Sequence, residues 1–163
     1  MSRCIFKDVI SRPNLKKMPK KRVLILCTGN SARSQMAEGL LRELAGDKFE
    51  VASAGTVASF VRPQATAVMR EIGIDISSHR SKCLDEFLGT PFDFVITVCD
   101  NANQSCPVFP GKVTRVHWSF DDPAEASGND DDVLQAFRRV RGEIRAKLVE
   151  FVEQQTKAFN PSI

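Results

Sequence analysis

The sequence of 163 residues contains no tyrosine, two histidines and one tryptophan. It has no apolar run near the ~18 residues that a membrane-spanning helix needs, and its N-terminus lacks the apolar core and small-residue cleavage site of a secretory signal. Neither histidine stands at a zinc-like spacing from the cysteines. These absences argue against a membrane protein, a secreted protein and a metal centre, and they predict a cytoplasmic chain without a bound metal.

The chain also lacks a basic stripe interleaved with aromatic residues. Its formal net charge is +3, but residues 1–21 hold seven Lys and Arg against one Asp, so the rest of the chain is mildly acidic. Nucleic-acid binding is therefore not expected. Residues 1–21 contain two prolines and have a basic end. They are predicted to form a flexible extension, within which Met18 is a candidate for the natural start.

From Arg22 onward, apolar strands alternate with helical segments, which predicts one α/β domain with a parallel sheet covered on both faces. Hydrophobic residues make up 42% of the chain, enough for a single core. The predicted domain spans 22–153, and 154–163 form a C-terminal tail. We expect strands at 22–27, 49–55, 92–99 and 113–120, and helices at 34–46, 63–73 and 131–153.

The octet CTGNSARS, residues 27–34, joins the first strand to the first helix. Such a junction lies at the carboxyl edge of a parallel sheet, where ligands bind. Successive loop N–H groups and the helix N-terminus can hold an anion, and Arg33 adds a fork suited to a tetrahedral oxyanion. Cys27 is then the nucleophile, Ser34 stabilises its thiolate, and Asn30 supplies a tight left-handed turn. The predicted substrate-binding residues are Thr28, Gly29, Asn30, Ser31, Ala32 and Arg33.

Other interpretations of this loop are weaker. No lysine follows its glycine in the G-x-x-x-x-G-K-[ST] pattern, so it is not a nucleotide-binding loop of that type. A cysteine that ends a strand can be a small buried hydrophobe, and Cys-x5-Arg alone also occurs by chance. The full octet between strand and helix favours the anion-binding nucleophile. Five cysteines in a reducing compartment likewise indicate catalysis, redox chemistry or metal rather than structural disulfides.

The segments LCTGNSARSQMAEG, SAGT and FDDPA follow in this order between residues 22 and 152. In these motifs the sequence resembles the low-molecular-weight tyrosine phosphatase family, and within it the thioredoxin-coupled arsenate reductases. The resemblance implies a three-layer sandwich: a four-stranded parallel sheet in the order 2-1-3-4, with helices on both faces. It covers the predicted domain and leaves out the two ends of the chain.

Displacing an oxygen from phosphate or arsenate requires a proton for the departing oxygen. Asp121 and Asp122 both lie on the loop after the last predicted strand. The family pattern of an aspartate directly before proline selects Asp122 as the general acid, and Pro123 restricts the backbone that aims it. Taken alone, Asp-Pro is an ordinary turn. Trp118 is expected to pack near this loop.

Cys99 ends the third predicted strand. In the implied order this strand lies beside the one that ends at Cys27, so both thiols reach one edge of the sheet. Cys106 follows after six residues. A regular helix between the two would separate their α carbons by about 10.5 Å, beyond the ~7 Å limit for a disulfide. The polar composition of residues 100–105 and the following Pro107 predict a mobile surface loop that can bend or rearrange.

In the family that the motifs resemble, this pair implies a relay. The Cys27 thiolate attacks arsenate, Cys99 attacks the Cys27 sulfur and expels arsenite, and Cys106 carries the oxidation out as a bond with Cys99 that thioredoxin reduces. Thioredoxin is the expected donor, although mycothiol- and glutaredoxin-coupled relatives exist.

The alternatives to the relay are two unrelated thiols, a protein tyrosine phosphatase that uses the same loop, and a non-catalytic redox or oxyanion sensor. Against a phosphatase, Ala124 follows Pro123 where such enzymes often carry tyrosine, and the chain has no tyrosine at all. A sensor would not need the acid at Asp122. The relay therefore remains the favoured interpretation, with arsenate as substrate and phosphate or sulfate able to occupy its place.

The sequence departs from the family at Ala32, where many relatives have a further cysteine. A protective disulfide between that position and the nucleophile is thus ruled out here. Cys4 and Cys83 have no clear partner and are expected to be bystanders. The protein is expected to be a monomer.

A second departure concerns potassium, which some arsenate reductases of the family bind beside the loop. Asn30, Glu38 and Ser53 match that pattern, but Lys82 stands where an aspartate would be expected. An ammonium group there can take the cation's place. We therefore expect no tightly bound cofactor and little dependence on potassium.

Overall fold

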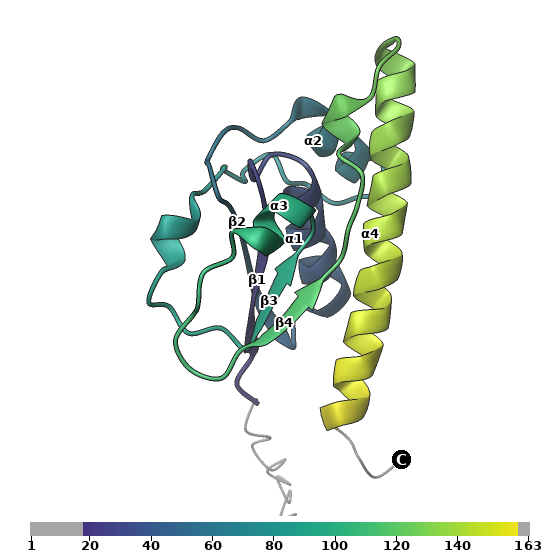
Figure 1. The fold of residues 1–163 in the computed structure, drawn as a ribbon. Helices are drawn as coiled ribbons and strands as arrows, with labels where there is room; N and C mark the ends of the chain where they lie inside the picture. The colour runs from purple at the N-terminus through teal and green to yellow at the C-terminus, as the bar shows by residue number, and fades with distance from the viewer. Residues whose placement is uncertain (1–17, 160–163) are drawn as a thin grey trace, which may run out of the picture.

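The computed structural model describes residues 18–159, which form a four-stranded parallel sheet in the order β2-β1-β3-β4 (Figure 1). The predicted order is confirmed. β1 takes a central place because its apolar run is buried from Val23 to Cys27, as a strand covered on both faces must be. The strand bounds are Lys21–Cys27 for β1, Phe49–Gly55 for β2, Phe94–Thr97 for β3 and Thr114–His117 for β4.

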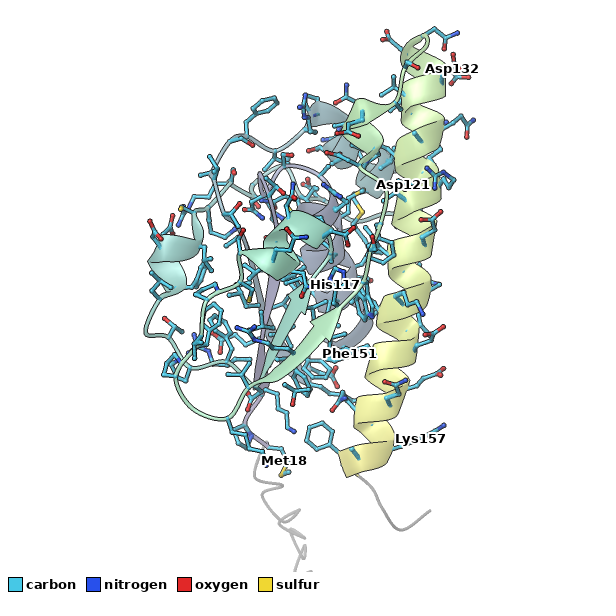
Figure 2. All side chains as sticks on the ribbon, in the orientation of Figure 1. Met18, His117, Asp121, Asp132, Phe151 and Lys157 are labelled. Carbon is cyan, nitrogen blue, oxygen red and sulfur yellow. The ribbon has the colours of Figure 1, made fainter. Side chains whose placement is uncertain are left out.

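Helices cover both faces of the sheet, as predicted (Figure 1). α1 packs against β1, β2 and the long helix α4, whereas α3 lies on the other face against β1 and β3. Phe151 of α4 points toward the sheet, and its ring centroid lies 5.1 Å from that of Phe94 (Figure 2). The helices are α1 Arg33–Ala45, α2 Pro63–Arg70, α3 Asp100–Gln104 and α4 Asp130–Phe159, with 3-10 turns η1 Leu84–Phe87 and η2 Pro123–Glu125.

α4 continues to Phe159, past the expected end at residue 153. The Thr156 hydroxyl donates to the carbonyl of Val152 at 2.8 Å, and Lys48 donates to Thr156 at 3.2 Å. The Lys21 ammonium lies 4.6 Å from the centroid of the Phe159 ring. Lys48 and Lys21 are distant from the helix in the sequence, so its apolar periodicity did not reveal its last turn.

Other elements are shorter than expected. β3 and β4 were predicted over 92–99 and 113–120, but each has four residues. β4 is an edge strand, and its ladder with β3 consists of four residue pairs. α2 ends at Arg70 rather than at 73. Gly73 has φ +80° and its N–H donates to the Arg70 carbonyl, which closes the helix end.

The prediction of a mobile loop between Cys99 and Cys106 was wrong, because residues 100–104 form the short helix α3. Ala102 is fully buried, and the N–H of Asn103 donates to the Cys99 carbonyl at 3.2 Å. Burying that single apolar side chain against the sheet stabilises a helical turn that the polar composition did not suggest. Cys99 immediately precedes this helix and Cys106 lies two residues after its end, so α3 stands between the two cysteines.

Residues 1–17 and 160–163 lie outside the described residues, and with them Cys4 and most of the predicted N-terminal extension. Within residues 18–159, no helix is long and apolar enough to cross a membrane.

Candidate active site

The predicted oxyanion loop, residues 27–33, leaves the buried end of β1 and leads directly into α1. Cys27 is 3% exposed. Its Sγ accepts the backbone N–H of Asn30 at 3.1 Å and lies 2.8 Å from the Ser34 hydroxyl. Two hydrogen-bond donors directed at one sulfur stabilise the charge of a thiolate.

Asn30 shapes this loop, as predicted, with a left-handed φ of +46°. Its Nδ2 donates to the Ser34 hydroxyl oxygen at 2.8 Å, which leaves the hydroxyl hydrogen of Ser34 available for the Cys27 sulfur. Gln35 donates to the Asn30 Oδ1 at 2.9 Å, so the orientation of the amide is fixed. Gln35 is fully buried, and no pattern in the sequence indicated its part in the loop.

Gly55, the last residue of β2, allows the loop to lie against the sheet. A Cβ atom there would come within 2.6 Å of the Thr28 carbonyl oxygen and 2.7 Å of the Asn30 nitrogen. Only glycine fits so close to another backbone. The SAGT motif contained this residue, but its steric role was not predicted.

Arg33 and Asp122 lie together beside the loop. One Arg33 nitrogen donates to the Phe120 carbonyl at 3.0 Å and another lies 3.3 Å from the Asp122 carboxylate, with side-chain exposures of 12% and 32%. The Ala124 N–H donates to the Asp122 carboxylate at 3.0 Å, which holds the carboxyl at the start of η2. Asp121 instead points toward α4, where it pairs with Arg139 at 3.3 Å (Figure 2). Of the two aspartates, Asp122 is therefore the one that lies beside Arg33.

Cys99 lies next to the oxyanion loop. The N–H of Val98 donates to the Leu26 carbonyl at 2.9 Å, which holds the end of β3 beside the end of β1. The Cys99 sulfur, 5% exposed as a residue, lies 3.3 Å from the Thr28 hydroxyl. Strand pairing therefore brings the second thiol to the residue that follows Cys27.

Cys106 lies beyond α3 and is half-buried, with its thiol 3.7 Å from the Pro107 carbonyl. Burial raises the pKa of this thiol, while the positive charge of Arg115 acts in the opposite direction. Cys27, Cys83, Cys99 and Cys106, the cysteines of residues 18–159, are all free thiols.

Within residues 18–159, neither Cys83 nor Trp118 hydrogen-bonds to the predicted catalytic side chains. The Cys83 backbone forms a bridge with Gly55, and its thiol lies 3.9 Å from the Thr56 carbonyl. The Trp118 ring packs on Phe120, 6.2 Å between centroids, two residues from the Asp122 loop. Trp118 therefore supports the loop from the core, near the position expected for it.

A buried polar cluster lies below the loop. Asn30 donates to the Ser53 hydroxyl at 2.9 Å, and Ser53 donates to Glu38. The Glu38 carboxylate also meets Arg42 at 2.6 Å and the Lys82 ammonium at 3.7 Å. Burial lowers the pKa of Lys82, and Glu38 opposes that effect. Among residues 18–159, no three His, Cys, Asp or Glu side chains gather into a metal-binding group.

Comparisons with known proteins give consistent matches. The family described as low molecular weight phosphotyrosine protein phosphatase matches residues 22–160. An arsenate reductase from Halalkalibacterium halodurans is 48% identical over 136 residues, covering 83% of this chain and 98% of that protein. A solved arsenate reductase in the phosphate-binding state aligns with a TM-score of 0.67 at 34% identity, over 82% of this chain and 98% of that one. A thioredoxin-dependent arsenate reductase from Corynebacterium glutamicum aligns with a TM-score of 0.61 at 31% identity, over 85% of this chain and 64% of that one.

Proposed function

Because the chain belongs to the low-molecular-weight phosphotyrosine protein phosphatase family, and within it to the arsenate reductases, we propose that it reduces arsenate by a thiol relay reset by thioredoxin. The observation that carries the relay is the Cys99 sulfur 3.3 Å from the Thr28 hydroxyl, on the loop that begins at Cys27. We assign the chemistry to one catalytic domain that begins at Arg22.

In the first step, arsenate binds over the N–H groups of residues 28–33 and the Arg33 guanidinium. The Cys27 thiolate attacks arsenic, a sulfur–arsenic bond forms, and an arsenic–oxygen bond breaks. Asp122 donates the proton with which that oxygen leaves as water. The Arg33–Asp122 distance of 3.3 Å supports this assignment, because the acid and the oxyanion-binding group occupy the same side of the loop.

In the second step, the Cys99 thiolate attacks the Cys27 sulfur. The sulfur–arsenic bond breaks and its electron pair stays on arsenic, so arsenic is reduced from the +5 to the +3 state and leaves as arsenite. The two sulfurs are oxidised to a disulfide. The burial of both thiols and their attachment to neighbouring strand ends support a direct reaction between them.

In the third step, Cys106 attacks Cys99 of that disulfide, and the electron pair of the broken bond leaves on Cys27 as a thiolate. A Cys99–Cys106 bond needs the two α carbons within about 7 Å, and α3 stands between the two residues, so we propose that α3 opens when this bond forms. Two thiols of thioredoxin then become a disulfide as Cys99 and Cys106 return to thiols. The thioredoxin-dependent relative supports this donor.

We further propose that the Lys82 ammonium replaces a potassium ion below the loop. Its position 3.7 Å from the buried Glu38 carboxylate supports this, since Glu38 joins Ser53 and Asn30 in a chain that reaches the loop. The rate of arsenate reduction is then the same in sodium and in potassium buffer. A clear requirement for potassium would contradict the role of Lys82.

The relay is tested with Cys106→Ser. The variant is expected to release one arsenite per chain and then stop with a trapped Cys27–Cys99 disulfide, because no thiol remains to free Cys27. Quenching with an alkylating agent and mapping the peptides identifies the bond. Cys83→Ser is the matched control and is expected to turn over continuously. Continuous turnover of Cys106→Ser with thioredoxin would overturn the relay.

A second candidate, phosphomonoester hydrolysis, uses the same groups. Cys27, Arg33 and Asp122 suffice to form and protonate a phosphocysteine intermediate. The observation that supports hydrolysis is the oxyanion loop together with Asp122 beside it. Weak hydrolysis of phosphoaryl substrates is expected from this shared chemistry. The buried Cys99 thiol beside the loop favours reduction as the main activity, because hydrolysis of a phosphocysteine requires water and not a second thiol.

A further inference from the structure

One face of β4 contacts both ends of the segment between Cys99 and Cys106. Arg115 and His117 stand two residues apart on this edge strand and so point to the same side. His117 Nε2 lies 3.0 Å from the carboxylate of Asp100, the first residue of α3. Its Nδ1 lies 2.8 Å from the hydroxyl of Thr97, at the end of β3. The start of the segment is therefore attached to the sheet through His117.

Arg115 holds the other end. Its Nη2 donates to the carbonyl of Cys106 at 3.4 Å and also to the carbonyl of Pro107. Both bonds are made to backbone, so the guanidinium fixes the position of the Cys106 residue itself rather than that of a neighbouring side chain. Arg115 is exposed and β4 is an edge strand, so nothing in the core depends on this contact.

The surroundings of Cys106 leave room for movement. A cavity of about 250 Å³ lies between the segment and β4, lined by Asn103 of α3, by Cys106 and by Arg115 and His117. Close-packed groups resist displacement, whereas groups that border a cavity can move with little loss of packing. Polar contacts to β4 therefore contribute to holding Cys106 where it is.

We infer that Arg115 is a positioning residue of the relay, which rests on the proposed function: it fastens Cys106 to β4 in the reduced enzyme and holds it apart from Cys99. To form a Cys99–Cys106 disulfide, Cys106 has to move toward Cys99 as α3 opens, so the bonds from Arg115 to Cys106 and Pro107 break or rearrange. A contact made in the dithiol and lost in the disulfide favours the dithiol. Arg115 therefore makes this disulfide easier for a donor to reduce.

The test is the equilibrium of the full-length protein with a dithiothreitol redox buffer, in which two electrons pass from the dithiol to the Cys99–Cys106 disulfide. Alkylation and peptide mapping measure the oxidised fraction of this pair. Arg115→Gln is expected to stabilise the disulfide about fivefold, about 20 mV for a two-electron couple. Arg115→Lys, which keeps the charge on a shorter side chain without the planar guanidinium, should fall between the native protein and Arg115→Gln. Arg145→Gln, at an exposed position on α4, is the control and should leave the equilibrium unchanged.

A second readout separates positioning from a general loss of structure. Because the charge of Arg115 lowers the pKa of Cys106 against the effect of burial, Arg115→Gln should move the pH profile of Cys106 alkylation to higher pH. Arg115→Lys should restore the native profile. Thermal unfolding checks that each variant is folded.

The outcomes separate this inference from the relay on which it rests. If the native protein forms a Cys99–Cys106 disulfide and Arg115→Gln leaves both its equilibrium and the alkylation profile unchanged, the inference is overturned and the relay stands. If the native protein never forms that disulfide, the relay falls, and the inference falls with it.

Discussion

Gly55 determines how closely the oxyanion loop can approach β2. The Thr28 carbonyl and the Asn30 N–H both lie within 3 Å of the place that a Cβ would fill. The same Asn30 N–H donates to the Cys27 sulfur, so a shift of the loop away from residue 55 alters the surroundings of the thiolate.

Gly55→Ala is accordingly expected to lower kcat/KM for arsenate by about tenfold or more, because small misplacements of reacting groups are costly. It should also lower the free energy of unfolding by about 2 kcal/mol through overpacking. Gly142→Ala is the matched control, since its Cβ meets nothing within 4 Å and alanine favours an exposed helix by about 1 kcal/mol. Native activity and stability in Gly55→Ala would refute this steric argument.

The oxyanion loop was predictable from residues that are adjacent in the sequence, whereas the contacts that hold the loop in place involve residues far apart in the sequence. Cys27, Arg33 and Ser34 lie within one octet, so their types and order were enough to predict the anion site. The contact of Gln35 with His79 at 3.0 Å spans 44 residues, and burial lowers the pKa of that histidine. Pattern alone could not reveal such a contact, because it exists only once α1 and the chain after α2 have packed together.

At the scale of elements, Glu71 holds the end of α2 against α4. Its carboxylate accepts from Arg138 at 2.7 Å and from Arg141 at 3.1 Å. The hydrogen bond from Arg138 is the main cause of a lowered pKa for Glu71, below its ordinary value of 4.5. A carboxylate with a lowered pKa stabilises the fold when ionised.

Glu71→Gln should therefore lower Tm at pH 7, and this difference from the native protein should disappear as the pH falls through the lowered pKa. The sign follows because the contribution is fully present above the ordinary glutamate value and is lost on protonation. Thermal unfolding at a series of pH values measures it. Exposed Glu153 of α4 provides the control Glu153→Gln. An equal difference at pH 7 and at pH 3 would mean that the charge of Glu71 contributes nothing.

The elements also show where sequence patterns were insufficient. Helices and central strands were predictable from apolar periodicity, because packing against one core imposes it. α3 was not, because Ala102 is its one apolar residue and its stability comes from contact with β1 and β3. That weak local preference supports the proposed opening of this segment in the relay.

At the scale of the whole molecule, the sheet order brings together residues that are far apart in the chain. β1 ends at Cys27 and β3 ends just before Cys99, and parallel pairing of the two strands aligns Leu26 with Thr97. The chain after β4 then places the Asp122 carboxylate beside the Arg33 guanidinium. The motifs predicted these residues, but the distances between them depended on a topology that only the family resemblance supplied.

The central claim is that electrons from a dithiol, rather than water, complete the catalytic cycle. Its most direct test is steady-state turnover of the full-length protein with thioredoxin, thioredoxin reductase and NADPH, measured with arsenate and, separately, with a phosphoaryl ester. We expect sustained NADPH oxidation that depends on arsenate, one arsenite formed for each NADPH, and far slower release of phosphate from the ester. Two results together would contradict the proposed cycle. The first is efficient hydrolysis of the ester. The second is that arsenate causes no NADPH oxidation, whether the electron donor is thioredoxin, mycothiol or glutaredoxin.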